Sequence, residues 1–393
     1  MRTGPNSCQT ESMGLRVVAI VLALLAVLGI ASPLAAAPAE PTAVVAMGDS
    51  FIAGEAGRWD GNASNNFGDR RGTDRAAYRR GWFWRYEQER VYGSSYANGC
   101  HRSDVAPIAS AGFDVEAVFN LACSGASTLD LLPSTAGGTW YRGERPQIDQ
   151  LADVAETHAV ELVAISIGGN DLGFSSVVLD CVVGYVTSSR WFPNTCNQTQ
   201  DRNVRAKLGT AMDNVARILS ETRRVLDENG DSAARIVLTS YPSPVAESDN
   251  IRYVETGWDR TFRGGCPLWD ADLDWANNVL VPLISGALEQ QALSAGVDFL
   301  DLSDALKGRE ACAASAQQRS SVNGSRSEWI RFITTGIAQG DAEESAHPNA
   351  YGQRALGRCL YLAAASSAPM DRCVNTPGSG FDQMTLESVL VGS

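Results

Sequence analysis

Residues 43–50 read Ala-Val-Val-Ala-Met-Gly-Asp-Ser, and this stretch decides the fold class. Five apolar residues followed directly by a polar turn are typical of a short buried strand that ends at the edge of a sheet. Proteins with open α/β sheets place their binding and catalytic side chains at the carboxyl ends of such strands. Ser50 is therefore the first candidate functional residue.

Two later apolar runs end in similar polar turns. Residues 115–121 lead into Cys123-Ser124-Gly125, and residues 162–167 lead into Gly168-Gly169-Asn170-Asp171. A fourth polar element, His347-Pro348-Asn349, comes just before a helical pattern near the end of the chain. A serine, a glycine, an asparagine and a histidine supply the nucleophile, the oxyanion donors and the base that acyl transfer requires.

The rest of the chain alternates strand-like and helical patterns. Further apolar runs occupy 236–239 and 297–300, and helical periodicity marks 204–228, 271–295 and 350–365. This alternation predicts a parallel sheet with helices on both faces. Four long polar segments separate the elements, and we expect them to carry function or to need disulfides. They are 55–105, 172–203, 242–270 and 303–345. Because there is no linker, composition break or repeat, we expect one elaborated domain.

The N-terminus has the pattern of a secretory signal peptide. Arg2 and Arg16 precede the apolar run 17–31, and small residues follow, so we expect a signal over 1–39, cleavage after Ala39 and a mature domain over 40–393. An uncleaved membrane anchor is the rival interpretation, although the run is short for a spanning helix. The net charge of −13 argues against nucleic acid and anionic membrane surfaces as partners. We expect a secreted, extracellular monomer without stable membrane insertion.

Cysteine usage agrees with export. Of nine cysteines, Cys8 lies in the expected signal, which leaves an even number in the mature chain. An even set in an exported protein favours disulfides. We expect sequence neighbours to pair, although the sequence leaves other connectivities and free buried thiols open. The expected pairs are Cys100–Cys123, Cys181–Cys196, Cys266–Cys312 and Cys359–Cys373. A metal site is not expected, because no pair has C-x-x-C spacing and there are only three histidines.

A serine hydroxyl needs a base within hydrogen-bond reach. Taken alone, Gly48-Asp49-Ser50 would favour Ser50 as the N-cap of the next helix, but the strand before it and the companion elements favour the nucleophile. His158 falls in an expected helical run over 148–161, and His101 lies beside a cysteine, where structural roles are the default. His347 is followed by Pro348, which favours an extended turn that can direct the ring back to the sheet. By elimination, His347 is the candidate base.

The base and the oxyanion both need partners. Glu344 is the candidate acid that orients His347, with Asp341 and Glu343 as competitors and a backbone carbonyl as the alternative. For the oxyanion we expect three donors: the Ser50 N–H, the Gly125 N–H and the Asn170 side-chain amide. Gly125 could instead be a simple turn glycine, and Asn170 a helix cap.

These four elements resemble the four signature blocks of the SGNH (GDSL-type) hydrolases. Gly48-Asp49-Ser50-Phe51 resembles the first block, Gly125 the second, Gly168-Gly169-Asn170-Asp171 the third, and His347-Pro348-Asn349 the last. The resemblance spans residues 43 to about 365 and is greatest for secreted actinobacterial esterases and lipases. It implies a three-layer α/β/α flavodoxin-like fold with a five-stranded parallel sheet. The family often has Asp three residues before the histidine, where this chain has Glu344; some secreted members use a main-chain carbonyl instead.

The sequence thus predicts a secreted serine esterase or lipase in which Ser50 is the nucleophile and His347 the general base, without cofactors. The expected substrate is a small-molecule or lipid ester. The alternatives are a carbohydrate acetyl esterase acting on polysaccharide and a non-catalytic binding protein on the same scaffold. An aromatic and arginine-rich stretch over 78–92 is either a substrate-binding wall beside Ser50 or a satellite core.

Overall fold

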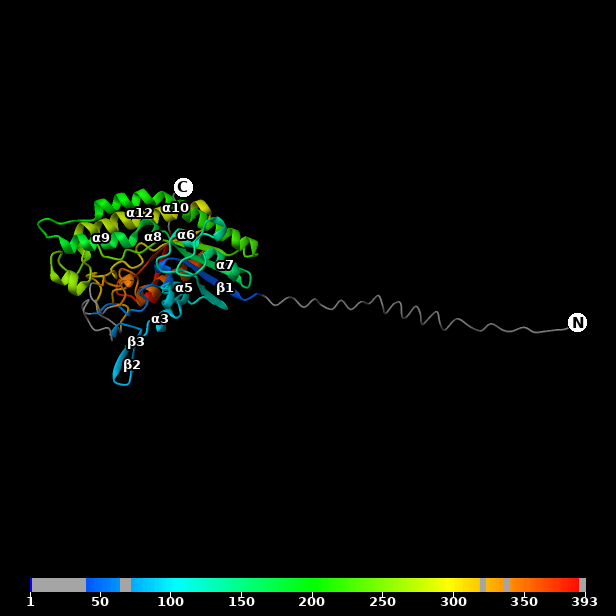
Figure 1. Cartoon of the computed structure of the whole chain (residues 1–393), viewed down its shortest axis with the longest axis horizontal. Coiled ribbons are helices and arrows are strands. Elements are labelled where there is room, and N and C mark those ends of the chain that lie inside the picture. The colour runs from blue at the N-terminus through cyan, green and yellow to red at the C-terminus, as the bar shows by residue number, and fades with distance from the viewer. Residues whose placement is uncertain (2–39, 64–71, 319–322, 335–339, 389–393) are drawn as a thin grey trace. The chain divides into compact units, whose positions relative to one another are not determined.

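The computed structural model describes residues 1, 40–63, 72–318, 323–334 and 340–388, and Figure 1 shows the course of the chain. Its centre is a seven-stranded sheet in the order β4-β1-β5-β6-β7-β8-β9. The strands are β1 Thr42–Gly48, β4 Ala117–Asn120, β5 Ala159–Ser166, β6 Arg235–Thr239, β7 Asp298–Asp301, β8 Met370–Val374 and β9 Thr385–Ser388. All neighbours are parallel except β8 and β9.

The expected α/β class is confirmed, but the expected strand count is too low. The five predicted strands correspond to β4-β1-β5-β6-β7, which is the flavodoxin-like order. Two further strands extend the edge, with Met370 of β8 paired to Phe299 of β7. The sequence analysis missed β8 because its five residues include the polar pair Asp371-Arg372. Such a short, polar strand is recognisable only from the strands β7 and β9 that pair with it.

Period-two alternation along β1 separates two cores. Ala43, Val45 and Met47 belong to a cluster that includes apolar residues of α7, α10 and α12. Val44 and Ala46 face the other way, into a cluster with residues of α5 and α13. This is the expected three-layer arrangement, because successive strand side chains point to opposite faces. Figure 1 shows α9, α10 and α12 together along one side, with the β2–β3 hairpin projecting from the opposite side.

The helices are short around the site and long on the outer faces. They are α2 Ser50–Ala53, α3 Glu89–Tyr92, α4 Ser95–Asn98, α5 Pro107–Ser110, α6 Thr128–Leu131, α7 Gln147–Ala155, α8 Gly169–Leu172, α9 Phe174–Thr187, α10 Asn197–Glu228, α11 Asp270–Trp275, α12 Val281–Ala295 and α13 Ala350–Ala365. A π-helical segment, Ala276–Leu280, joins α11 to α12. The hairpin strands are β2 Ala77–Arg80 and β3 Phe83–Tyr86.

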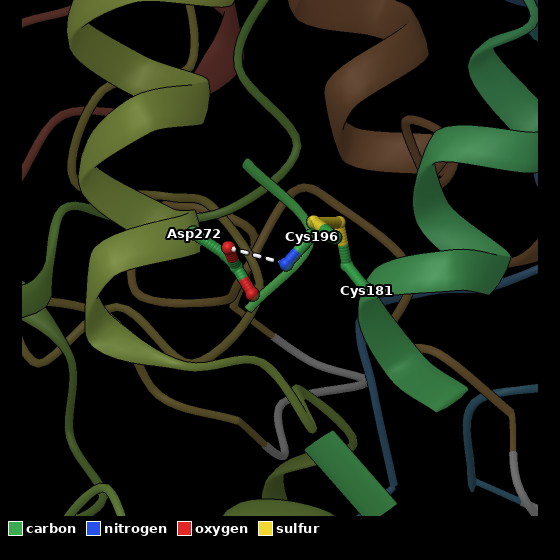
Figure 2. Close-up of side chains that lie close together, drawn as sticks. All are labelled: Cys181, Cys196 and Asp272. Atoms are coloured by element: carbon green, nitrogen blue, oxygen red, sulfur yellow. Dashed lines mark hydrogen bonds between the residues drawn. A yellow bond between two sulfur atoms is a disulfide. The ribbon is translucent and has the colours of Figure 1, made fainter. Parts of the chain in front are cut away.

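The segment 172–203 is not the loop that its polar composition predicted. It contains α9 and the first turns of α10, which begins at Asn197 rather than at 204. Figure 2 shows the Asp272 carboxylate accepting a hydrogen bond from the N–H group of Cys196, at 3.0 Å. The same oxygen accepts from the N–H group of Asn197, also at 3.0 Å. A carboxylate from a distant helix thus caps the start of α10. The sulfurs of Cys181 and Cys196 are bonded to each other, so they offer no thiolate for a metal.

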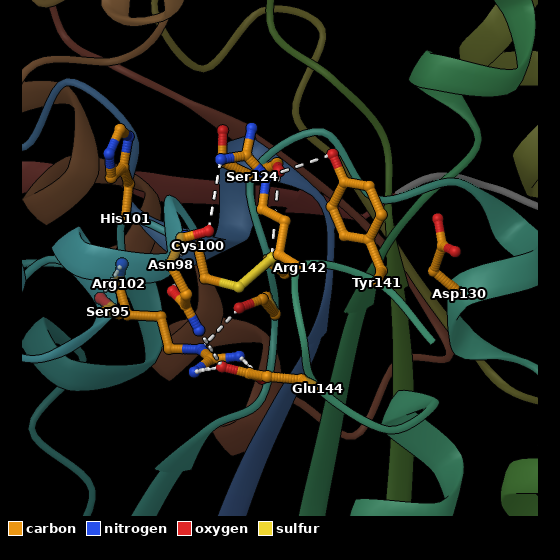
Figure 3. The surroundings of a disulfide bond; sticks show 12 residues. Ser95, Asn98, Cys100, His101, Arg102, Ser124, Asp130, Tyr141, Arg142 and Glu144 are labelled. Atoms are coloured by element: carbon orange, nitrogen blue, oxygen red, sulfur yellow. Dashed lines mark hydrogen bonds and ion pairs between the residues drawn. A yellow bond between two sulfur atoms is a disulfide. The ribbon is translucent and has the colours of Figure 1, made fainter. Parts of the chain in front are cut away.

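Four disulfides join sequence neighbours: Cys100–Cys123, Cys181–Cys196, Cys266–Cys312 and Cys359–Cys373. These are the pairs that the spacing of the cysteines suggested. Cys100–Cys123 ties the chain after α4 to the turn after β4, and Figure 3 shows the Arg102–Glu144 ion pair beside it. The expected signal peptide, including Cys8, lies outside the described residues. From Pro41 onward the chain forms one compact unit.

Candidate active site

The turn after β1 can form only because residue 48 is glycine. Gly48 has φ +142°, and a Cβ there would lie 2.0 Å from the Ser166 carbonyl oxygen on β5. The Gln147 side chain holds both backbone groups of Gly48: its Oε1 accepts from Gly48 N at 2.7 Å, and its Nε2 donates to Gly48 O at 2.9 Å. This close packing fixes where the chain leaves the sheet, and so it fixes the position of the residues that follow.

Ser50 is the first residue of α2, and Asp49 caps that helix. Asp49 Oδ1 accepts a hydrogen bond from Phe51 N at 3.1 Å, so Asp49 rather than Ser50 has the capping role. The Ser50 hydroxyl lies 2.7 Å from His347 Nε2, although 297 residues separate the two. The structure therefore brings together the predicted nucleophile and the predicted base.

The other nitrogen of His347 fixes its tautomer. His347 Nδ1 lies 3.0 Å from the Ser345 carbonyl oxygen, which can only accept. Nδ1 therefore carries the proton, and in the neutral ring Nε2 is the acceptor for the Ser50 hydroxyl. Burial lowers the pKa of His347 from its ordinary 6.5, against the opposing charge of Glu55. Both effects leave a neutral imidazole ready to take a proton.

We expect this lowered pKa to appear in the pH dependence of turnover. The neutral imidazole is the active form, so kcat/KM should rise with pH through a midpoint below 6.5 and be close to its maximum at neutral pH. A profile of kcat/KM with a soluble p-nitrophenyl ester measures that midpoint. A midpoint above 6.5 would contradict the assigned surroundings of His347.

The loop that carries His347 is held by a neighbouring extended segment. Arg331 N donates to His347 O at 2.8 Å, and Ala346 N donates to Arg331 O at 3.0 Å. Asn349 then caps α13 by accepting from Tyr351 N and Gly352 N. The sequence analysis did not identify the supporting segment, because its contact with residues 346–349 is a pairing between distant parts of the chain.

Glu344 does not orient His347, which corrects the expectation from the sequence. Its carboxylate is buried and accepts from Trp59 Nε1 at 2.7 Å and from the Tyr92 hydroxyl at 2.8 Å. Arg58 Nη1 lies 4.0 Å away, and burial raises the pKa of Glu344 to about 7. The hydrogen-bond partner of His347 Nδ1 is instead the Ser345 carbonyl, at 3.0 Å, which takes the orienting position. This is the main-chain alternative that the sequence left open.

Glu344→Ala is accordingly expected to affect stability rather than chemistry. Removing the carboxylate takes away the acceptor of the Trp59 and Tyr92 donors and a negative charge beside Arg58. This loss should lower the free energy of unfolding by roughly 3–5 kcal/mol. Urea unfolding measures the loss, and kcat per folded molecule should stay near the wild-type value. A selective fall in kcat without destabilisation would return the orienting role to Glu344.

The predicted oxyanion donors come from three loops at the same edge of the sheet. Asn170 Nδ2 donates to Ala126 O at 2.8 Å, so the turn after β5 meets the turn after β4. One amide hydrogen of Asn170 stays available, and within the described residues the N–H groups of Ser50 and Gly125 have no acceptor. Gly125 has φ +84°, and a Cβ there would lie 2.4 Å from the Tyr141 hydroxyl. A side chain is therefore excluded at that position.

Tyr241 is a site residue that the sequence analysis missed. Its hydroxyl donates to Asp49 Oδ2 at 2.5 Å and accepts from Gly169 N at 3.1 Å. The phenol thus connects the serine turn to the asparagine turn. Burial raises the pKa of Asp49 to about 7, and burial together with the charge of Asp49 raises the pKa of Tyr241 well above its usual value. Tyr241 follows β6 closely, so the strand-end rule applied to β6 would have found it.

His101 and His158 have other surroundings. His101 Nδ1 lies 2.9 Å from Glu55 Oε2, and its ring stacks against Tyr92 with centroids 4.8 Å apart. Burial lowers the pKa of His101, but the hydrogen bond and charge of Glu55, together with the charges of Glu343 and Glu344, outweigh burial and leave the pKa above its ordinary value. His158 lies between α7 and β5, at the amino end of the sheet, rather than within a helix.

A hydroxyl hydrogen-bonded to an imidazole at the carboxyl edge of a parallel sheet is the arrangement expected of a serine hydrolase. The model of the GDSL-like lipase/acylhydrolase family matches residues 44–360, and the chain belongs to this family. This confirms the resemblance to the SGNH hydrolases. Among curated proteins, none shows a significant match to the chain.

Several solved structures are similar to the chain. An extracellular lipase from Streptomyces rimosus has 22% identity and a TM-score of 0.47, with 83% of this chain and 100% of that chain covered. An aryl esterase from M. smegmatis has 13% identity and a TM-score of 0.33, with 82% and 97% covered. A family two carbohydrate esterase from Clostridium thermocellum has 13% identity and a TM-score of 0.34, with 84% and 65% covered. At these values the neighbours do not indicate a substrate for this chain.

Proposed function

We propose that the protein is a secreted esterase or lipase that hydrolyses carboxylic esters through an acyl-enzyme on Ser50. The observation that carries this proposal is the 2.7 Å contact between the Ser50 hydroxyl and His347 Nε2, with Nδ1 held by the Ser345 carbonyl. Covalent acyl transfer needs three parts: a nucleophile, a base, and a group that orients the base.

In the proposed reaction, Ser50 Oγ attacks the ester carbonyl carbon while its proton moves to His347 Nε2. The negative charge on the carbonyl oxygen is stabilised by the N–H groups of Ser50 and Gly125 and by the Asn170 amide. The tetrahedral intermediate collapses, and His347 gives the proton to the leaving alcohol. Water then attacks the acyl-enzyme with His347 again as base, which releases the acid and restores Ser50.

The cleft beside Ser50 has apolar walls, which favour an apolar acyl group in the substrate. The walls include Phe51, Phe174, Leu280 and Ile284. Phe174 and Leu280 also line a second small apolar cavity, so the apolar surface continues away from the serine. An acyl chain placed there would exclude water from the reacting carbonyl. No residue of 78–92 lines this cleft, so the aromatic stretch is not a wall beside Ser50.

Export is part of the proposal. Four disulfides persist most readily in an oxidising environment outside the cytosol. In the part of the chain that the structure describes, we find no helix long and apolar enough to cross a membrane.

Two experiments test the proposed function. A fluorophosphonate should label wild-type protein and fail to label Ser50→Ala, which separates an enzyme from a binding protein on the same scaffold. Hydrolysis of p-nitrophenyl esters from acetate to palmitate should then give a chain-length optimum. An optimum at acetate would favour carbohydrate deacetylation, whereas a longer optimum favours a lipase. Folded protein that neither labels nor hydrolyses any ester would refute the proposal.

A further inference from the structure

A polar cavity of about 700 Å³ lies beside the catalytic cleft, outside the carboxyl end of β7. Two chain segments connect the two spaces: Pro242 lines the cleft and Ser243 the cavity, while Val281 lines both. Val281 follows directly on the π-helical turn Ala276–Leu280, and such irregular turns are frequent at functional sites. In α/β folds ligands bind in crevices at this edge of the sheet.

Glu310 is the unexplained group of this cavity. It lines the cavity and is only 5% exposed, and its Oε2 has no hydrogen-bond partner among the described residues. Burial raises its pKa to about 7. A buried polar atom without a partner costs free energy, so its presence calls for an explanation. A ligand that donates a hydrogen bond to this oxygen provides one.

The cations of the cavity already have partners. Asp301 accepts from the hydroxyls of Ser240 and Ser285 and pairs with Arg372 at 2.9 Å. Asp304 pairs with Lys307 at 3.7 Å, and Arg309 lies over the Trp329 ring, 5.3 Å from its centroid. In the part of the lining that the structure describes, no cluster of free cations is therefore available to bind a phosphate or sulfate.

The rest of the lining narrows the class of ligand. Among the described residues that line the cavity, none is aromatic, so the cavity lacks the cage that binds quaternary ammonium groups. What remains are carboxylates, hydroxyls and amides, including Glu247, Glu289 and Asn278. Such groups accept hydrogen bonds from the hydroxyls of a neutral sugar or polyol.

We propose that this cavity binds the polyhydroxylated alcohol part of an ester whose acyl group occupies the apolar cleft beside Ser50. The inference rests on the proposed function, because it needs the ester carbonyl at Ser50. An ester of this kind has one apolar and one hydroxyl-rich end, and the two adjoining spaces match those ends. Glu310 accepts a hydrogen bond from one hydroxyl of the alcohol.

Two esters with the same acyl group test this assignment: p-nitrophenyl butyrate, which has no hydroxyls, and 6-O-butyryl glucose. Glu310→Gln should raise KM for the glucose ester by roughly tenfold, since a weaker amide acceptor replaces the carboxylate, and leave KM for p-nitrophenyl butyrate unchanged. Asn278→Trp, which fills the cavity from an exposed position, should have the same selective effect. Glu161→Gln, on the exposed start of β5, is the matched control.

The outcomes separate the two proposals. If the variants change KM equally for both esters, or for neither, the cavity does not bind the alcohol, while the serine hydrolase assignment stands. If wild-type protein hydrolyses neither ester, the proposed function fails and the role of the cavity fails with it.

A second inference rests on a different part of the molecule, the β2–β3 hairpin. Figure 1 shows it projecting from the body. At its tip the Trp82 and Phe83 side chains are 91% and 69% exposed. The satellite core that the sequence offered as an alternative exists, but it consists of Ala76, Val91 and Tyr92 rather than of these tip residues.

Three exposed arginines flank the tip. Arg79 and Arg80 belong to β2 and Arg85 to β3, and none forms an ion pair with another described residue. The net charge of the whole chain is −13, so this cluster of positive charge is local and opposite in sign to the net charge. Exposed tryptophan and phenylalanine beside arginine are typical of segments that rest in a lipid interface.

We infer that the hairpin tip docks the protein on an anionic lipid surface. The aromatic rings would enter the headgroup region, and the arginines would add electrostatic attraction to anionic lipids. Such peripheral contact needs no membrane-spanning helix. The net charge of −13 argued against anionic membrane surfaces as partners. The local positive charge of the hairpin tip can nevertheless attract such a surface, because the tip alone would contact it.

Sedimentation with lipid vesicles tests this inference. Wild-type protein should bind phosphatidylcholine vesicles that contain phosphatidylglycerol at least tenfold more tightly than vesicles of phosphatidylcholine alone, and salt should weaken binding. Trp82→Ser/Phe83→Ser should abolish binding, while Trp258→Ser, a change at another exposed tryptophan, should not. Unchanged hydrolysis of soluble p-nitrophenyl butyrate shows that each variant is folded. Equal binding by wild type and the tip variant would overturn the inference.

Discussion

Replacing His347 with alanine is expected to lower kcat on p-nitrophenyl butyrate by roughly 10⁴- to 10⁶-fold. His347 Nε2 lies 2.7 Å from the Ser50 hydroxyl and is the only base within hydrogen-bond reach of it among the described residues. The substitution removes this base. A neutral serine hydroxyl is a poor nucleophile, and the leaving alcohol also loses its proton donor. Steady-state kinetics over the same substrate range measures the loss.

Two controls make this result specific. Ser50→Ala/His347→Ala should be no slower than the slower single variant, because the two residues act as one unit. His158→Ala should behave like wild type, since His158 lies at the amino end of the sheet beside Thr157. A loss of less than about tenfold in folded His347→Ala would remove this histidine from the mechanism.

Asn170→Ala is expected to lower kcat by about 100- to 1,000-fold with little change in KM. The free hydrogen of its amide is placed to meet charge that develops only in the transition state, so the loss should fall on kcat. Its other hydrogen bond, to Ala126 O at 2.8 Å, holds the amide in place.

Part of that loss could come from a displaced loop rather than from a missing donor, and Tyr241→Phe separates the two. This change removes the hydroxyl that connects Asp49 to Gly169 and leaves the Asn170 amide in the chain. We expect a smaller fall in kcat than for Asn170→Ala. If Tyr241→Phe costs more than Asn170→Ala, positioning of the turns is the larger effect and the donor assignment of Asn170 is wrong.

The sequence by itself determined the α/β class, the parallel sheet and the candidate chemistry, whereas the flavodoxin-like strand order was only implied by the family resemblance. These follow from local signals: apolar runs of strand length, helical periodicity, and polar turns directly after strands. Ser50, Gly125 and Asn170 follow the ends of strands, which the parallel arrangement places at one edge, and His347 stands just before a helix. The helix over Ala350–Ala365 has the predicted bounds because both its Asn349 cap and its apolar stripe are local.

The tertiary structure alone decided how those residues are supported. Glu344 stands three residues before His347, yet its carboxylate bonds Trp59 and Tyr92, which are more than 250 residues away in the chain. The Ser345 carbonyl orients the imidazole, and a backbone group leaves no trace in the sequence.

The sequence analysis missed Tyr241, the capping of α10 by Asp272, and strand β8 for the same reason. Each depends on a contact between distant segments, and such contacts are selected by packing and by the need to satisfy buried polar groups. Spacing along the chain shows which residue types stand at strand ends. Only the folded chain shows which donor meets which acceptor, because a buried carboxylate or carbonyl bonds the donors that packing brings to it.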